Sequence, residues 1–157
     1  MSNPADKVYT PDQIAADVVQ VFRPTGIVME PCRGKGAISK YLPDDHLWCE
    51  IDDGRDFLQF NGKVDWIVTN PPYSKFTEIL GKALLVADNI VFITPVNKVL
   101  GSMVRLKMIN KAHGIKQIHF IGSGREIGFQ FGFPVGAIHI KRGYTGDIKP
   151  TYYKEAA

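Results

Sequence analysis

An asparagine, two prolines and a tyrosine follow an apolar segment near the middle of the chain. Residues 64–68 are rich in branched and aromatic side chains, which predicts a strand buried on both faces of a parallel sheet. Pro71 and Pro72 cannot donate a hydrogen bond to that sheet, so the strand must end before them. We therefore expect the Asn70 side chain to project beyond the carboxyl end of the strand, where open α/β sheets bind their ligands.

These residues suit a flat group that carries an amino substituent. The Asn70 side-chain oxygen and the Pro71 carbonyl can each accept one N–H, and the ring of Tyr73 offers a stacking surface. Two acceptors on one amine concentrate electron density on its nitrogen and aim its lone pair. The plainer alternative is a rigid turn between a strand and a helix, in which Asn70 is only a cap.

Asn70-Pro71-Pro72-Tyr73 resembles the catalytic motif of the S-adenosylmethionine-dependent amino-methyltransferases. Members of this family methylate adenine N6 or the amide of a protein glutamine. The resemblance implies that Asn70 and Pro71 hold the amine in line with the methyl group, while Tyr73 stacks on a base flipped out of its duplex. It also implies that Asn70 borders the cofactor and that Pro72 belongs to the catalytic turn.

A second part of this resemblance lies near the N-terminus, in Tyr9-Thr10-Pro11. An apolar periodicity predicts a helix in residues 8–22, with Thr10 as its N-cap and Pro11 at its first position. Alone, this is an ordinary amphipathic helix. In one subgroup of DNA adenine methyltransferases, however, a Tyr-Thr-Pro segment folds over the methionine end of the cofactor, and the resemblance assigns that role to these three residues.

A glycine-bearing turn follows the first expected strand, which covers residues 26–30. Gly34 and Gly36 allow the backbone to approach a ligand closely and to adopt positive φ, and we expect a short helix to follow and end near residue 43. The pattern Glu-Pro-Cys-x-Gly-x-Gly resembles the S-adenosylmethionine loop of the same methyltransferases. This resemblance implicates Glu30, Pro31, Gly34 and Gly36 in cofactor binding.

Carboxylates follow the second expected strand, residues 46–51. Glu50 lies at its end, where a carboxylate can accept hydrogen bonds from both ribose hydroxyls of a nucleoside. In the family, an Asp followed by an apolar residue binds the cofactor adenine, and Asp56 and Phe57 match those residue types. They follow Glu50 so closely that the helix normally found between these strands must be missing. The roles of Asp52 and Asp53 stay open.

The remaining segments alternate between helical and strand patterns. We expect helices in residues 74–84, capped by Ser74, and in residues 98–112, and strands in residues 89–95, 115–121 and 135–141. The order resembles the class I methyltransferase fold, a Rossmann-like three-layer α/β sandwich with a mostly parallel sheet and an antiparallel C-terminal hairpin. We expect one catalytic domain spanning residues 1–157, with its core in residues 8–142 and a peripheral tail from residue 144.

Length and composition limit the other possibilities. The 157 residues contain two cysteines, Cys32 and Cys49, without metal-ligand spacing and with four scattered histidines, so neither a disulfide framework nor a metal site is expected. The chain has no apolar stretch of the ~20 residues that span a bilayer and does not begin like a signal peptide. We therefore expect an intracellular, cytoplasmic protein that does not enter the membrane.

Charge is distributed unevenly along the sequence. Residues 1–97 contain 9 Lys and Arg against 13 Asp and Glu, whereas residues 98–157 contain 10 against 3. The basic part predicts a surface for a polyanion, although a solvated face that serves solubility is an equal alternative. The candidate nucleic-acid contacts are Lys98, Arg105, Lys107, Lys111, Arg125, Phe129 and Phe131. The phenylalanines alternate, which favours core positions over a role in holding a displaced base.

Together the motifs predict methyl transfer from S-adenosylmethionine to the N6 of adenine in DNA. The alternatives are methylation of an amino group in RNA, methylation of a protein glutamine amide, and a cofactor- and DNA-binding protein without turnover. Little of the chain lies outside the expected catalytic core, so no separate recognition domain is expected. Target specificity would then come from short loops, from a partner subunit or from a second copy in a homodimer.

Overall fold

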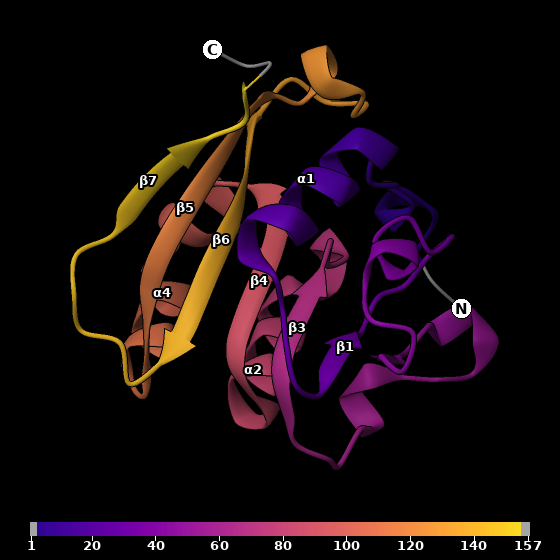
Figure 1. The fold of residues 1–157 in the computed structure, drawn as a ribbon, viewed down its shortest axis with the longest axis vertical. Helices are drawn as coiled ribbons and strands as arrows, with labels where there is room; N and C mark the ends of the chain where they lie inside the picture. The colour runs from indigo at the N-terminus through magenta and orange to yellow at the C-terminus, as the bar shows by residue number, and fades with distance from the viewer. Residues whose placement is uncertain (1–2, 155–157) are drawn as a thin grey trace.

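The computed structural model describes residues 3–154, which form three layers around a seven-stranded sheet (Figure 1). In spatial order the strands are β2 (Leu47–Trp48), β1 (Val28–Glu30), β3 (Val64–Thr69), β4 (Ala87–Pro95), β6 (Pro134–Arg142), β5 (His113–Ser123) and β7 (Lys149–Tyr152). Every neighbouring pair is parallel except the two pairs that involve β6. The expected mostly parallel sheet with an antiparallel C-terminal hairpin, here β5 and β6, is confirmed.

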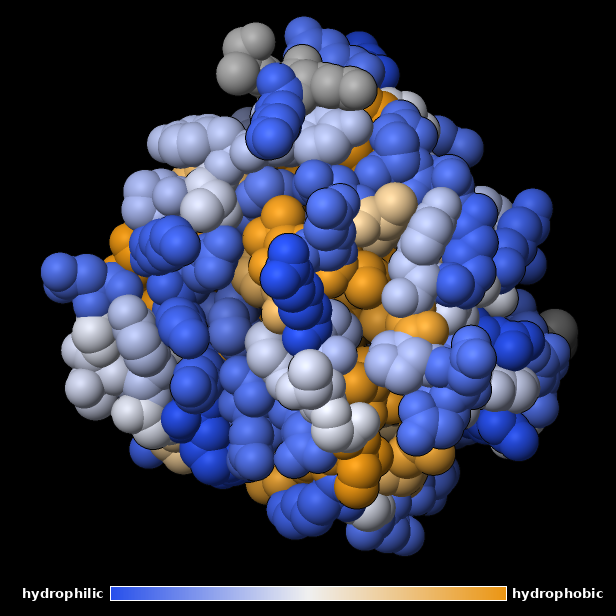
Figure 2. Space-filling view, viewed as in Figure 1, coloured by the Kyte–Doolittle hydropathy of each residue, from blue (hydrophilic) through white to orange (hydrophobic). Residues whose placement is uncertain are grey.

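Helices cover both faces of the sheet. Helix α1 (Asp12–Phe22) lies on one face, and α2 (Phe76–Val86) and α4 (Met103–Asn110) lie on the other (Figure 1). The face that carries α1 is mostly hydrophilic, with hydrophobic residues visible only in broken patches (Figure 2). Short helices complete the fold: α3 (Asn97–Leu100) and the 3₁₀ turns Pro4–Asp6, Ser39–Tyr41, Ile51–Asp53, Phe57–Gln59, Tyr73–Lys75 and Arg125–Ile127.

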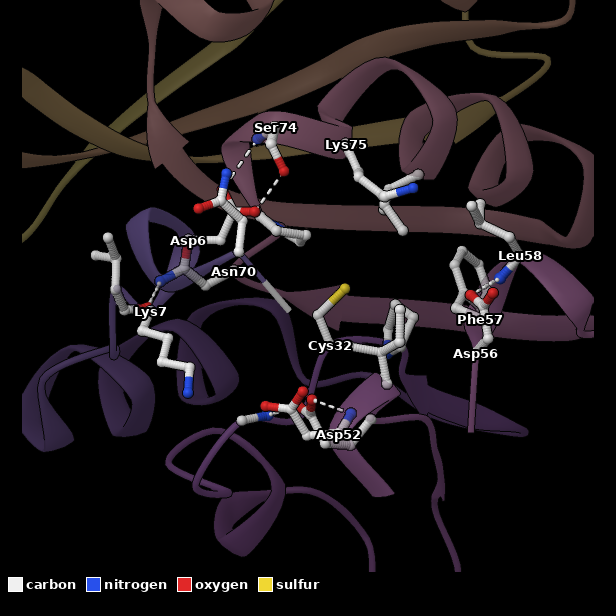
Figure 3. A pocket seen from close by; sticks show the side chains of 18 of the residues that line it. Asp6, Lys7, Cys32, Asp52, Asp56, Phe57, Leu58, Asn70, Ser74 and Lys75 are labelled. Atoms are coloured by element: carbon white, nitrogen blue, oxygen red, sulfur yellow. Dashed lines mark hydrogen bonds between the residues drawn. The ribbon is translucent and has the colours of Figure 1, made fainter. Parts of the chain in front are cut away.

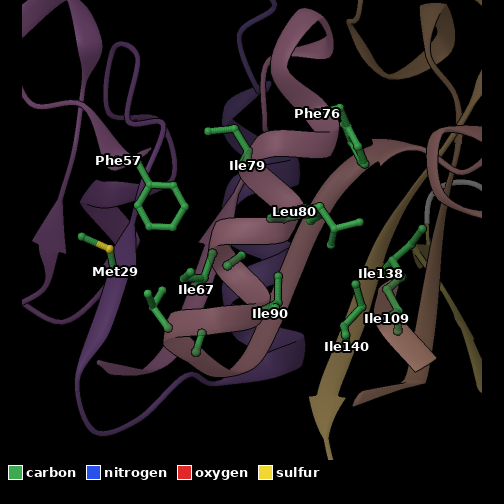
Figure 4. Close-up of a cluster of buried hydrophobic side chains, with 14 of the residues drawn as sticks. Met29, Phe57, Ile67, Phe76, Ile79, Leu80, Ile90, Ile109, Ile138 and Ile140 are labelled. Carbon is green, nitrogen blue, oxygen red and sulfur yellow. The ribbon is translucent and has the colours of Figure 1, made fainter. Parts of the chain in front are cut away.

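The central strands are buried on both sides, as their apolar sequences predict. Successive strand residues point to opposite faces, so Ile67 of β3 packs with α2, whereas its neighbour Val68 packs beneath α1. Strand β4 repeats the pattern with Ile90 and Val91. Figure 4 shows the cluster between the sheet and α2, which includes Leu80. These strands therefore form a rigid frame whose carboxyl ends carry the residues of the candidate site.

Some expected elements differ in the structure. The helix expected at residues 98–112 is divided into α3 and α4, because Ser102 adopts extended backbone angles and its side chain caps Arg105 N at 3.3 Å. The helix expected after the glycine turn is only the 3₁₀ turn Ser39–Tyr41. The tail is not peripheral, because β7 pairs with β5 and Tyr153 is buried.

Two expected helix caps are also wrong. The N-cap positions of α1 and α2 are Pro11 and Lys75, and neither makes a side-chain capping bond. The hydroxyl of Thr10 instead accepts a hydrogen bond from Asn70, and the hydroxyl of Ser74 donates to Asp6. Both side chains thus connect the N-terminal segment to the turn after β3.

Candidate active site

A cavity of about 650 Å³ lies beside the carboxyl ends of β1, β2 and β3. It is bordered by the N-terminal segment, the glycine turn, the turns after β2 and the start of α2. The lining residues are Asn3, Asp6, Lys7, Val8, Tyr9, Pro31, Cys32, Gly34, Lys35, Glu50, Ile51, Asp52, Asp53, Asp56, Phe57, Leu58, Asn70, Pro72, Ser74, Lys75, Glu78 and Ile79. Asn70 and Ser74 lie at the same end as Asp6, whereas Asp56 and Leu58 lie at the other end (Figure 3).

The glycine turn has the conformation that its residues predict. Gly34 and Gly36 have φ of 54° and 82°, which a side chain would disfavour. The Gly34 N–H donates to Glu50 Oε2 at 2.6 Å, and the other oxygen of this carboxylate accepts from Asp52 N at 3.2 Å. The ring of Tyr9 packs over Gly34. Glu50 therefore ties the turn to the end of β2 while it lines the cavity.

The turns after β2 form the far end of the cavity. Glu50 and Arg55 form an isolated β-bridge, with only the 3₁₀ turn Ile51–Asp53 between them. As the short spacing from Glu50 to Asp56 predicts, no helix longer than this turn separates these two residues. Asp56 Oδ1 accepts from Leu58 N at 2.9 Å. Phe57, the residue expected to stack on adenine, is only 2% exposed and belongs to the core. Leu58 and Ile51 also line the cavity and offer it apolar surface, and Ile51 is 38% exposed.

Asn70 is held from the N-terminal side. Its Nδ2 donates to the Val8 carbonyl at 3.1 Å and to Thr10 Oγ1 at 3.2 Å. A carbonyl oxygen can only accept, so the contact with Val8 identifies the amide nitrogen. The Asn70 Oδ1 meets no donor among residues 3–154, and it is therefore available as an acceptor at the cavity.

Tyr73 and Pro71 do not line this cavity, although the sequence places them beside Asn70. The ring of Tyr73 meets Phe131 edge-on at 5.9 Å between centroids, and the Lys98 ammonium lies 4.9 Å from its centre. The Tyr73 hydroxyl is buried without a hydrogen-bond partner, and burial raises its pKa above the usual value. The expected stacking surface is thus contacted by Phe131 and Lys98 in this structure.

Other residues expected at the cofactor lie outside the cavity wall: Thr10, Pro11, Glu30 and Gly36. Glu30 is 1% exposed and accepts a hydrogen bond from the Ser39 hydroxyl. Burial raises the Glu30 pKa to about 8, despite the opposing effect of that hydrogen bond. In this position Glu30 supports the turn that follows the glycines.

The basic residues do not form one surface. Lys98 and Arg125 follow the carboxyl ends of β4 and β5, whereas Lys111 lies just before the start of β5, at the opposite edge of the sheet. Arg105 is half-buried, and its guanidinium donates to Thr77 Oγ1 and to the Lys98 carbonyl. These residues therefore do not share one side of the molecule, and phosphate contact at each of them stays a prediction.

Two further residues of that set also lie apart from Lys98 and Arg125 or inside the core. Lys107 is exposed on α4, in the turn that leads toward Lys111. Phe129 is 6% exposed within the core beneath α1, as the alternation of aromatic residues favours. Phe131 contacts Tyr73 and is the one phenylalanine of the expected pair that lies near the candidate site.

The cavity is negatively charged, because six carboxylates and three lysines line it.

Three residues that line the cavity were not predicted there from the sequence: Ile51, Ser74 and Cys32. Two sequence signals could have identified the first two residues. Ile51 directly follows the carboxylate Glu50 at a strand end, and Ser74 places a hydroxyl directly after Tyr73. Cys32 lies between the two ends of the cavity, and burial raises its thiol pKa, so it is a neutral wall group.

No family model and no curated protein matches the chain by sequence. Solved structures do match. The methyltransferase subunit of a type I restriction-modification system from Streptococcus thermophilus superposes with a TM-score of 0.69 at 14% identity, over 96% of this chain and 48% of that one. A candidate class I S-adenosylmethionine-dependent methyltransferase from Listeria monocytogenes gives 0.69 at 11% identity, over 97% and 67%.

A candidate RNA methyltransferase from Pyrococcus horikoshii gives a TM-score of 0.66 at 14% identity, over 90% of each chain. The chain therefore has the class I methyltransferase fold. It spans about half of the Streptococcus subunit. Within residues 3–154, no helix has the length and apolar character that a bilayer crossing requires.

Proposed function

We propose that this protein binds S-adenosylmethionine in the cavity and methylates an exocyclic amino group, with adenine N6 in DNA as the substrate. The orientation of the Asn70 amide carries the proposal. An acceptor oxygen at one end of a nucleoside-sized cavity suits an incoming amine, and a donor there would repel it. The methyltransferases that share this fold support the reaction class.

The cavity residues fit the cofactor in size, charge and polarity. A volume of about 650 Å³ accommodates a nucleoside with an amino-acid tail. The excess of carboxylates favours a ligand with positive charge and disfavours the phosphates of dinucleotides. Glu50 would hold the ribose hydroxyls, Asp56 the adenine amino group, and Leu58 with Ile51 the ring face. When bound, S-adenosylmethionine supplies an electrophilic methyl group on its sulfonium.

The protein then contributes alignment and fixed dipoles. Asn70 Oδ1 and the Pro71 carbonyl accept the two N–H groups of the amine, which directs the nitrogen lone pair toward the cavity. No donor among residues 3–154 engages either oxygen. Alignment of this kind can lower a barrier by roughly 7–11 kcal/mol, and acceptors placed before reaction stabilise the positive charge that develops on nitrogen. Tyr73 provides the stacking face once Phe131 and Lys98 move aside.

DNA is the first candidate because methyltransferase subunits of type I restriction-modification systems share the fold. RNA is the second candidate, and a specific observation favours it. The candidate RNA methyltransferase matches over 90% of both chains, whereas the DNA-modifying subunits are about twice as long. In the DNA case, a partner subunit or a second copy would supply target recognition.

A radiometric assay tests the proposal directly. Tritiated S-adenosylmethionine is incubated with duplex DNA, single-stranded DNA, RNA and a protein panel, and transfer is measured for the wild type, Asn70→Ala and Asn61→Ala. Removal of one preorganised polar contact costs ~10²–10³ in turnover, so Asn70→Ala should lose that much and still bind cofactor. Asn61 is exposed and away from the cavity, which makes it the matched control.

Each outcome is informative. Transfer to DNA adenine supports the proposal, and transfer to RNA moves the substrate to the second candidate. Transfer to protein alone favours a glutamine amide. If Asn70→Ala keeps full turnover on the substrates of the wild type, amine activation by this side chain is wrong.

A further inference from the structure

The N-terminal segment determines which end of the Asn70 amide faces the cavity. Both N–H groups of the amide are used, one by the Val8 carbonyl at 3.1 Å and one by Thr10 Oγ1 at 3.2 Å. Thr10 is only 8% exposed, so water cannot easily replace its hydroxyl. An amide rotated by 180° would place its oxygen against the Val8 carbonyl, two acceptors in contact, and would lose that bond, whereas the Thr10 hydroxyl could turn and donate to it. The Val8 carbonyl therefore selects the orientation, and the Thr10 hydroxyl fixes the amide in place.

We propose that Thr10 is a positioning residue for the transfer reaction: its hydroxyl, with the Val8 carbonyl, holds the Asn70 amide so that Oδ1 receives the substrate amine. This inference rests on the proposed function and adds to it. The sequence resemblance assigns Thr10 to the cofactor, but Thr10 does not line the cavity. Its hydroxyl acts through Asn70 and contacts neither substrate nor cofactor.

A role for Thr10 in capping α1 does not explain these contacts. The N-cap position of α1 is Pro11, and no side-chain capping bond is made there. The Thr10 hydroxyl is instead directed at a residue sixty positions later, across the end of β3. A threonine that served only the helix would leave the Asn70 amide without its second acceptor.

The same segment is fastened at a second point. The Asp6 carboxylate accepts from Ser74 N at 3.0 Å and from the Ser74 hydroxyl. Between the two attachments, Lys7, Val8 and Tyr9 line the cavity. The segment that borders the cavity is therefore also the one that holds Asn70, and loss of its contacts would leave the amide free to rotate.

Three variants and two readouts test the inference. Thr10→Val keeps the shape and removes the hydroxyl, Thr10→Ser restores the hydroxyl, and Thr25→Val is a control because Thr25 is exposed outside the site. Turnover with the best substrate and the dissociation constant for S-adenosylmethionine are measured for each. We expect Thr10→Val to lower kcat about tenfold, as the loss of one hydrogen bond predicts, with cofactor affinity within about twofold of the wild type. Thr10→Ser should recover most of the rate.

The second readout does not depend on activity. Hydrogen exchange of the Asn70 side-chain amide is followed by NMR in the full chain, and exchange should be faster in Thr10→Val than in wild type or Thr25→Val. Asp6→Asn weakens the other attachment without altering Thr10, and it should also speed this exchange. It replaces Thr10→Val in the test if Thr10→Val does not fold. Unchanged exchange and unchanged kcat in Thr10→Val would overturn the inference. A wild type that transfers no methyl group but shows the protected amide would refute the proposed function alone.

Discussion

Glu50 accepts the Gly34 N–H at 2.6 Å, so the carboxylate at the end of the second strand closes the glycine turn that follows the first. The same carboxylate lines the cavity, where it can also receive the hydroxyls of a ribose. One side chain therefore shapes the backbone of the glycine turn and lines the cavity in which we propose that the cofactor binds.

Glu50→Ala should weaken S-adenosylmethionine binding by about 10- to 100-fold, because charge-assisted hydrogen bonds contribute roughly 1.5–3 kcal/mol each at most. Calorimetric titration gives the affinity, and circular dichroism checks that the fold survives. Asp56→Ala should also weaken binding, because the contact proposed for the adenine amino group is lost. Asp45→Ala is the charge-matched control, because Asp45 is exposed and outside the cavity. Equal affinity for Glu50→Ala and Asp45→Ala would move the ribose contact to Asp52 or Asp53.

Tyr73→Phe and Tyr73→Ala should separate the ring from the hydroxyl. The hydroxyl is buried without a partner, so its removal should leave turnover within about threefold and should not reduce stability. Loss of the ring should lower kcat/KM for a nucleic acid about 10- to 100-fold, as expected for base stacking. Steady-state kinetics and thermal unfolding measure both effects. A Phe variant as impaired as the Ala variant would show that the hydroxyl takes part in the reaction.

Stability should fall as pH rises, because of Glu30. Its folded-state pKa is about 8, whereas an unfolded Glu titrates near 4.5, so the folded chain binds more protons between these values. The free energy of unfolding should therefore decrease from about pH 4.5 to about pH 8 and then level off. Glu30→Gln should remove this slope and be more stable than wild type at pH 8 by roughly 2–4 kcal/mol.

Urea unfolding at several pH values checks this prediction. Glu126→Gln is the matched control, because Glu126 is an exposed carboxylate beyond the site. The measurement should stay above pH 6.5, since burial lowers the His139 pKa to about 4 and this group costs stability as pH falls below 6.5. A wild type and Glu30→Gln with parallel pH profiles would contradict the buried protonated carboxyl.

Salt dependence should distinguish the two edges of the sheet. If a nucleic acid lies over the candidate site, Arg125 meets phosphate and Lys111 does not, because Lys111 lies at the opposite edge. Arg125→Ala should reduce the slope of log affinity against log salt by about 0.9 per lost contact on duplex DNA. Fluorescence anisotropy titrations at several salt concentrations measure the slope. Equal losses in Arg125→Ala and Lys111→Ala would mean that the bound strand also covers the far edge.

Local steric rules in the sequence determined the frame of this protein. Pro71 and Pro72 end β3 wherever it lies in the sheet, and Gly34 and Gly36 accept positive φ without a cost that other residues would incur. The short distance from Glu50 to Asp56 likewise excludes a long helix between them. Such features depend on neighbours in the chain, so they could be predicted without knowing the fold.

Contacts between distant segments were decided only by the tertiary structure. Thr10 and Ser74 carry the local signal of helix caps, yet their hydroxyls bond to Asn70 and Asp6, because the fold places those partners within reach. Phe57 lies in the core, and Lys111 lies at the edge of the sheet opposite the candidate site. Burial and position in the sheet depend on all the layers together, so neither could be predicted from neighbouring residues. The sequence alone therefore predicted Asn70 as the candidate acceptor, and the packing of the N-terminal segment against β3 decided which way its amide faces.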